Sequence, residues 1–132
     1  MANPLLILED KRLLADELAR HFARQGWETR TAGTLAEARD VLVGRGFEPL
    51  VILADMSLPD GYALDLVEDM RGQGVPGEWI LLTGYGGVTD TVRALRLGAY
   101  DFLEKPCPLD RLTVVLGGAK RAAGDILKRL AD

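Results

Sequence analysis

The sequence is poor in the features that mark several large classes of protein. Among its 132 residues there is one cysteine, Cys107, which excludes an internal disulfide and a metal site built from four thiolates. No apolar run approaches the length of a membrane span, and the first residues lack the basic start and long apolar segment of a signal peptide. We therefore predict a cytoplasmic protein without a membrane segment.

Positive charge and histidine are also scarce. The chain has 16 Lys and Arg against 20 Asp and Glu, which gives a net charge of −4. Such a chain has no overall basic field that would attract nucleic acid or an anionic membrane, so direct DNA binding is not expected. The one histidine, His21, falls in a predicted helix without the four-helix setting of a phosphorelay histidine, and we expect it at the surface.

What the sequence does contain is a regular alternation of short apolar runs and helical patterns. The runs at residues 4–8, 27–31, 50–54, 79–82 and 100–103 are typical of strands. Helical spacing follows at residues 11–25, 35–43, 62–71, 88–97 and from 109 onward, and Thr34 is a predicted N-cap. This order predicts one domain over residues 1–132, a three-layer α/β sandwich around a parallel five-stranded sheet.

The stretch at residues 50–61 is the centre of this pattern, because a continuous apolar run there ends on one acid, Asp55. A run without alternation is typical of a strand buried on both faces. The chemistry of open α/β sheets lies at the carboxyl ends of the strands, where the following loops form a crevice. Pro59 and Gly61 predict a turn into the next helix.

Polar side chains follow four of the predicted strands: Glu9 and Asp10, Asp55, Thr83, and Lys105. Three carboxylates at one edge repel each other unless a cation neutralises them, and Mg²⁺ prefers a few carboxylates with water and phosphate oxygens. Such a set is suited to a phosphoryl group. Asp55 would be the nucleophile, with Lys105 and the Thr83 hydroxyl on the phosphoryl oxygens.

Each of these residues also has an ordinary structural interpretation. Asp10 alone is explained as the N-cap of the first helix, and Thr83 as a β-branched residue at the end of a strand. Lys105 alone would be a solvated charge. Their joint placement after four separate strands favours the phosphoryl or metal site.

The same residues resemble the receiver domain of two-component response regulators. The resemblance covers essentially the whole chain: the acid pair at 9–10, Asp55 followed by Leu-Pro-Asp-Gly, Thr83, and Lys105-Pro106. Residues 97–106 further resemble the receivers of NtrC-like activators that work with sigma-54 polymerase. The family implies a flavodoxin-like (βα)5 fold with strand order 2-1-3-4-5. It also implies a signalling switch that is not an enzyme beyond its own phosphorylation and dephosphorylation.

The resemblance implies a role for each matching residue. Asp55 would accept a phosphoryl group from a sensor histidine kinase. Mg²⁺ would be held by the carboxylates of Glu9, Asp10 and Asp55 and by the main-chain carbonyl of Ser57. Thr83 would turn toward the phosphoryl group.

Phe102 occupies the position of the family's aromatic switch residue, which moves inward with Thr83. Phenylalanine keeps the packing change but lacks the hydroxyl of the tyrosine that relatives often carry. The Lys105-Pro106 bond is expected to be cis. Tyr85 is expected to shield the phosphoryl group from water and give a phosphorylated lifetime of minutes or longer; in the alternative its ring points to solvent.

Two rival functions come from other classes. An aspartate-nucleophile phosphohydrolase needs a second acid two residues after the nucleophile, and Ser57 occupies that position. A flavodoxin-like flavin module needs a hydroxyl-rich phosphate loop after its first strand, where Glu9 and Asp10 would instead repel the flavin phosphate. Both rivals are disfavoured, and the receiver interpretation predicts a part in transcription regulation.

The last predicted helix has two interpretations. It carries an apolar stripe that outlasts what covers the sheet: Leu112, Val115, Leu116, Ala119, Ala123, Ile126, Leu127 and Leu130. Gly117, Gly118 and Gly124 weaken a helix and favour a core helix with a frayed tail. In the other interpretation about the last ten residues begin a linker helix that pairs in a homodimer and leads to a C-terminal output domain.

Overall fold

The computed structural model describes residues 3–44, 46–85 and 87–131. One parallel sheet has the order β2-β1-β3-β6-β7, with these bounds: β1 Asn3–Leu8, β2 Trp27–Ala32, β3 Val51–Asp55, β6 Glu78–Thr83 and β7 Asp101–Glu104. The helices are α1 Arg12–Ala23, α2 Leu35–Val43, α3 Ala63–Gly72, α4 Val88–Arg96 and α5 Leu109–Ala131. The predicted fold class and the strand order 2-1-3-4-5 are confirmed.

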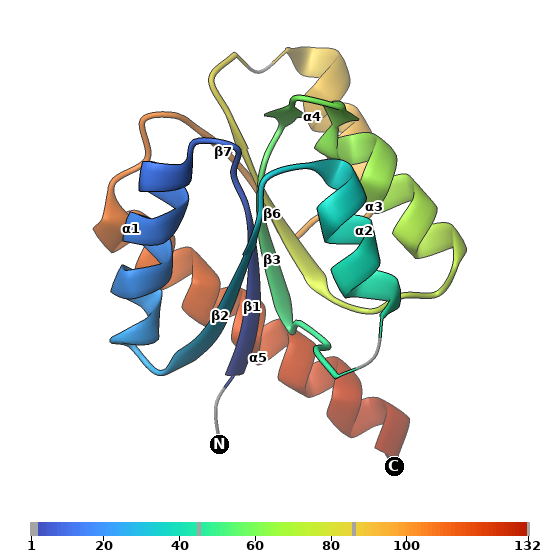
Figure 1. Cartoon of the computed structure of the whole chain (residues 1–132). Helices are drawn as coiled ribbons and strands as arrows, with labels where there is room; N and C mark the ends of the chain where they lie inside the picture. The colour runs from blue at the N-terminus through green and yellow to red at the C-terminus, as the bar shows by residue number, and fades with distance from the viewer. Residues whose placement is uncertain (1–2, 45, 86, 132) are drawn as a thin grey trace.

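The sheet lies between two layers of helices. Figure 1 shows α1 and α5 on one face and α2, α3 and α4 on the other. Alternate residues of each central strand face the two layers: Leu6 of β1 packs with the α2–α4 side, and Leu5 with the α1–α5 side. Burial on both faces explains why the strand before Asp55 is apolar without alternation.

The ends of α2 and α4 differ in their capping. Thr34 caps α2 as predicted, because its Oγ1 accepts a hydrogen bond of 3.1 Å from the Glu37 amide. The N-cap of α4 is Gly87, which offers no side chain. At the other end of α4, Gly98 takes a positive φ of 74°, which favours glycine and ends the helix.

A short antiparallel hairpin follows Asp55, and the sequence patterns did not predict it. Its strands are β4, Ser57–Leu58, and β5, Gly61–Tyr62, joined through the predicted Pro59 turn. Strands of two residues are too short for an alternating pattern. The hairpin therefore depends on its turn and on contacts with the rest of the fold.

The helix α5 is continuous to Ala131 and packs on α1 and the sheet. Its glycines do not interrupt it, and Gly118 has a packing role, since a Cβ there would collide with the Tyr100 hydroxyl. His21 of α1 is half-buried instead of fully exposed, and its ring lies 3.3 Å from the Thr113 hydroxyl of α5. Among the described residues, no helix is both long and apolar enough to cross a bilayer.

Candidate functional site

The polar residues predicted at the strand ends lie together at the carboxyl edge of the sheet. Glu9 and Asp10 follow β1, and Asp55 ends β3, its immediate neighbour in the sheet. Each of the three can offer a carboxylate oxygen, and these oxygens all lie within 4.8 Å of one another. The parallel pairing of β1 with β3 brings about this closeness, because it aligns the two strand ends.

Lys105 supplies the positive charge of the cluster. Its Nζ lies 3.1 Å from Asp55 Oδ2 and 3.5 Å from Glu9 Oε1. Partial burial would lower the pKa of Lys105, but the hydrogen bond and charge of Asp55, together with Glu9, raise it above its ordinary value. The lysine is therefore an ammonium at neutral pH.

Glu9 is the buried acid of the cluster, with 5% of its surface exposed. Burial raises the pKa of Glu9 above its ordinary value, against the lowering effect of the hydrogen bond that its Oε2 accepts from the Lys11 amide at 3.0 Å. Asp10 and Asp55 raise this pKa further, and Lys105 lowers it. A bound cation would favour the ionised form of such an acid.

The N-cap interpretation of Asp10 is not supported by the structure. The N-cap residue of α1 is Lys11, whose side chain makes no capping hydrogen bond. Asp10 is exposed and faces the same cluster as Glu9 and Asp55. Asp10 is therefore part of the acid cluster and not the N-cap of α1.

Thr83 and Phe102 lie on the adjacent strands β6 and β7. Thr83 is 3% exposed, and its Oγ1 accepts a hydrogen bond of 3.1 Å from the Tyr85 amide. Phe102 is half-buried against the α2–α4 side of the core. The Lys105-Pro106 peptide bond is cis, as expected.

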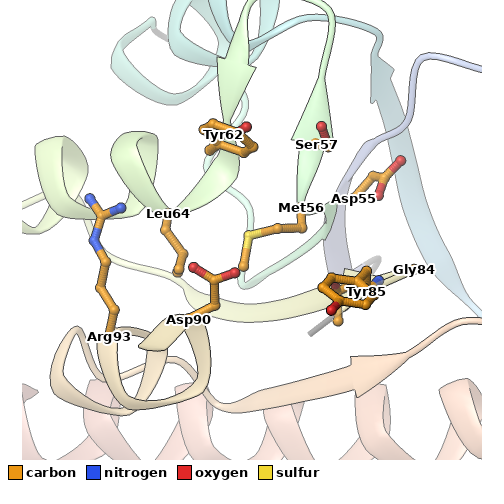
Figure 2. Close-up of a pocket in the computed structure, with 10 residues that line it drawn as sticks. Asp55, Met56, Ser57, Tyr62, Leu64, Gly84, Tyr85, Asp90 and Arg93 are labelled. Carbon is orange, nitrogen blue, oxygen red and sulfur yellow. The ribbon is translucent and has the colours of Figure 1, made fainter. Parts of the chain in front are cut away.

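A cavity of about 540 Å³ opens beside Asp55 and extends toward α4. Figure 2 shows Asp55 and Tyr85 on one side of it, Met56 and Asp90 near its middle, and Arg93 on the other. The hairpin strands carry Ser57 and Tyr62 along the cavity, which therefore connects the strand end to the face of α4. Ser57 stands two residues after Asp55, where the phosphohydrolase mechanism needs an acid.

Tyr85 lines the rim of this cavity, but 92% of its surface is exposed. In this structure the ring points to solvent, which is the second alternative considered above. The lifetime of a phosphorylated state stays a prediction. The loop between Thr83 and α4 contains Gly84, Gly86 and Gly87, and of these Gly86 lies outside the residues that the structure describes.

Sequence reasoning missed two arginines, Arg93 beside the cavity and Arg71 at the opposite edge of the sheet. Arg93 Nη2 lies 2.7 Å from Asp65 and 3.0 Å from Glu68 of α3. Arg71 donates to the carbonyls of residues 77, 97 and 98, at 3.1 to 3.2 Å. Ion pairs between helices and bonds to main-chain oxygens leave no periodic signal in the sequence.

Comparison with known proteins extends these observations. The family model described as response regulator receiver domain matches residues 5–116. The response regulator protein PilR of Pseudomonas aeruginosa is 35% identical over 116 residues, which cover 88% of this chain and 26% of PilR. The photosynthetic apparatus regulatory protein RegA of Rhodovulum sulfidophilum is 33% identical over 112 residues, 85% of this chain and 60% of RegA. The chain thus spans about a quarter to three fifths of these relatives.

A solved structure has the same fold and a related sequence. It is a response regulator protein from Burkholderia pseudomallei with a phosphorylated aspartic acid, a calcium ion and citrate. The TM-score is 0.76 with 26% sequence identity, over 98% of this chain and 73% of that chain.

Proposed function

The chain belongs to the response regulator receiver domains of two-component systems, and on that basis we propose that Asp55 accepts a phosphoryl group from a sensor histidine kinase. The observation that carries the proposal is the position of Asp55 between an ammonium and two further acids, Lys105, Glu9 and Asp10. The phosphorylated aspartic acid of the Burkholderia relative supports the same chemistry.

The acid cluster fits a divalent cation. Oxygen donors from Glu9, Asp10 and Asp55 converge within 4.8 Å, and the Ser57 main-chain carbonyl is the proposed fourth ligand. Carboxylates alone suit Mg²⁺ or Ca²⁺ better than a softer transition metal. When bound, Mg²⁺ would offset the charge that gathers on the attacking carboxylate and the transferred group.

The proposed transfer forms one bond and breaks one. An Asp55 carboxylate oxygen attacks the phosphorus of a phosphohistidine as the N–P bond breaks, and that electron pair remains on the imidazole nitrogen. The Lys105 ammonium, already 3.1 Å from Asp55, donates to a phosphoryl oxygen. Its positive charge thereby offsets the repulsion between the acyl phosphate and the neighbouring carboxylates.

The switch that we propose begins at Thr83. Its hydroxyl oxygen accepts a hydrogen bond from the Tyr85 amide in this structure. Once the side chain turns, the hydroxyl proton would donate to a phosphoryl oxygen. The loop to α4 would move with it, and Phe102 would pack into the space left by Thr83. The change at one strand end would thus reach the face of α4.

The test of the phosphoacceptor is an intact-mass measurement after incubation with acetyl phosphate and Mg²⁺. We expect a gain of one phosphoryl group in the wild type and none in Asp55→Asn, which keeps the shape but removes the nucleophile. No gain in a folded, Mg²⁺-binding wild type would reject the proposal. The chain would then act as a pseudo-receiver, through protein contacts alone.

The output of the switch is proposed from the tail of α5. Its apolar stripe is buried as far as Ala123, but Ile126 is 46% and Leu130 79% exposed, and the Leu127 side chain lies outside the described residues. We interpret this tail as the start of a linker helix that pairs in a homodimer and leads to an output domain for transcription regulation. Location in the cytoplasm stays a prediction.

Light scattering tests the dimer. A receiver that pairs through this tail changes its mass when beryllofluoride and Mg²⁺ are added, and Leu130→Asp should cancel that change because it places a charge in the pairing stripe. An unchanged mass in the wild type would leave the tail as the exposed end of a core helix.

A further inference from the structure

One side chain ties the hairpin after Asp55 to a helix that does not belong to the site. Asp60, in the turn of the hairpin, accepts hydrogen bonds from the amides of Leu35 at 2.8 Å and Ala36 at 3.0 Å. These are the first residues of α2, and their N–H groups have no acceptor within the helix. The carboxylate satisfies two such donors at the positive end of the helix dipole.

The next residue brings the hairpin into close contact with the same helix. Gly61 has φ of 147°, and a Cβ there would lie 3.0 Å from Leu35 Cδ1. A side chain at Gly61 would crowd the end of the Leu35 side chain and would strain the backbone at this positive φ. The turn of the hairpin is thus bonded to α2 through Asp60 and lies close to it at Gly61.

The base of the hairpin is fixed from the other side. The Met56 amide donates to the Leu82 carbonyl of β6 at 2.8 Å, and the Ala63 amide donates to the Met56 carbonyl at 2.8 Å. Ser57 pairs with Tyr62 between this base and the turn. The position of the Ser57 main chain is therefore set by β6 at one end and by Asp60 at the other.

The start of α2 is itself connected to the acid pair. The Glu9 amide donates to the Ala32 carbonyl at 3.0 Å, and the Gly33 amide, one residue on, donates to Glu37 of α2 at 3.0 Å. The loop before α2 therefore touches the main chain of Glu9, while α2 itself holds the hairpin. The start of α2 is therefore connected both to the main chain of Glu9 and to the hairpin that carries Ser57.

We propose that Asp60 is a positioning residue for the metal site, which fixes the Ser57 carbonyl relative to the carboxylates of the acid cluster. The inference rests on the proposed function, since it takes that carbonyl as a ligand. The Leu35 amide holds the pKa of Asp60 below its ordinary value, so the carboxylate is ionised at neutral pH. Without its bonds the hairpin keeps its base but loses its fixed turn.

Mg²⁺ binding by the full chain, measured by titration calorimetry, tests this role. We expect Asp60→Ala to raise the dissociation constant for Mg²⁺ by about tenfold. This is the lower end of the effect of removing a group that orients a metal ligand. Asp60→Asn should weaken it less, because its amide oxygen still accepts one N–H. Hydrogen exchange at the Leu35 and Ala36 amides reports directly on the bonds removed.

Thr34→Ala is the matched control. Thr34 caps the same end of α2, but its bond to the Glu37 amide stays within that helix and does not reach the hairpin. The proposal expects unchanged Mg²⁺ affinity in this variant. Equal weakening by Thr34→Ala and Asp60→Ala would overturn it, because a loosened α2 would then explain both results.

The other outcomes separate the inference from the proposed function. A wild type that binds Mg²⁺ and an Asp60→Ala variant that binds it equally well would overturn the positioning role and leave the phosphoacceptor proposal standing. A wild type that does not bind Mg²⁺ would reject the metal site and the positioning role together. If Asp60→Ala does not fold, the Mg²⁺ affinity of Asp60→Asn is compared with those of the wild type and Thr34→Ala instead.

Discussion

The neighbouring helices α3 and α4 cover the same face of the sheet but are held to it in different ways. The apolar residues that α3 buries are Ala63, Leu64, Leu66, Val67 and Met70. The one residue that α4 buries is Ala94, while Val88, Val92 and Leu95 are exposed on its described surface. Core packing therefore holds α3, and it contributes little to the position of α4.

Polar contacts from α3 take the place of packing for α4. Arg93 reaches across to Asp65 and Glu68, and Arg71 binds the carbonyls of Leu97 and Gly98 at the end of α4. Such contacts are weaker than a packed core and can be exchanged for contacts with water. The difference teaches that a helix held by core packing and one held mainly by polar contacts can share one layer, and the second of them adjoins Thr83.

The largest effect should come from truncating a buried apolar side chain of α3, compared with an exposed one of α4. Met70→Ala should lower the free energy of unfolding by about 2–5 kcal/mol, because it leaves a cavity in the core. Val92→Ala, at a side chain 40% exposed, should change it by no more than about 0.5 kcal/mol. Urea unfolding measures both, and equal losses would mean that α4 is packed like α3.

The next effect concerns the end of α4. Arg71→Met keeps an apolar stem but removes the guanidinium that donates to three carbonyls, at a cost of about 1–3 kcal/mol. Hydrogen exchange should become faster in α4 than in α3, because Leu97 and Gly98 lose their tie. A uniform change over both helices would show that Arg71 supports the whole layer.

A smaller effect is expected from the ion pairs of Arg93. All three side chains are at least a third exposed, so Arg93→Gln should cost less than about 1 kcal/mol, and the cost should fall as salt is added. Arg39→Gln, which breaks the Arg39–Asp69 pair between α2 and α3, is the control. Only the Arg93 variant should speed amide exchange in α4; the same exchange pattern in both would remove the special place of α4.

The sequence predicts features set by neighbouring residues better than contacts between distant ones. The strands, the Thr34 cap and the strand-end residues were found because burial on two faces and a local cap leave patterns in neighbouring residues. The receiver family was recognised from the same strand ends, and the family match confirms it. The roles proposed for Asp55, Thr83 and Lys105 stay predictions, and the intact-mass experiment tests that of Asp55.

Contacts between distant residues could not be predicted in this way. Asp60 caps a helix that starts 25 positions earlier, and the turn pattern gave no sign of that partner. Gly118 was expected only to weaken α5, whereas it makes room for Tyr100 from another element. In each case the residue contacts a part of the chain that is distant in the sequence and comes near only in the folded structure.

A pH measurement extends the comparison to the starts of α2 and α4. The folded pKa of Asp60 is lowered, so its contribution to stability is present above the unfolded value of about 3.8 and is lost as pH falls through the lower folded value. Below that pH, protection of the Leu35 and Ala36 amides should fall toward that of Asp60→Asn. Protection in α4, whose start has no side-chain cap, should not follow this titration.

The smallest effect is expected at Tyr85, in the connection between Thr83 and α4. Because the ring is 92% exposed, Tyr85→Ala should change the lifetime of phosphorylated Asp55 by no more than about twofold, well under 1 kcal/mol in the barrier to hydrolysis. Decay of the phosphorylated mass in both proteins measures it, and Tyr62→Ala is a control at another exposed ring beside the same cavity.

A much shorter lifetime in Tyr85→Ala alone would mean that the ring covers the phosphoryl group after all. Since the ring is exposed in this structure, covering would require the connection to α4 to move once Asp55 is phosphorylated. That result would restore the shielding predicted from the sequence and would show the motion itself. A small change in both variants would instead mean that access of water to the phosphoryl group is set by the buried residues of the site and not by Tyr85.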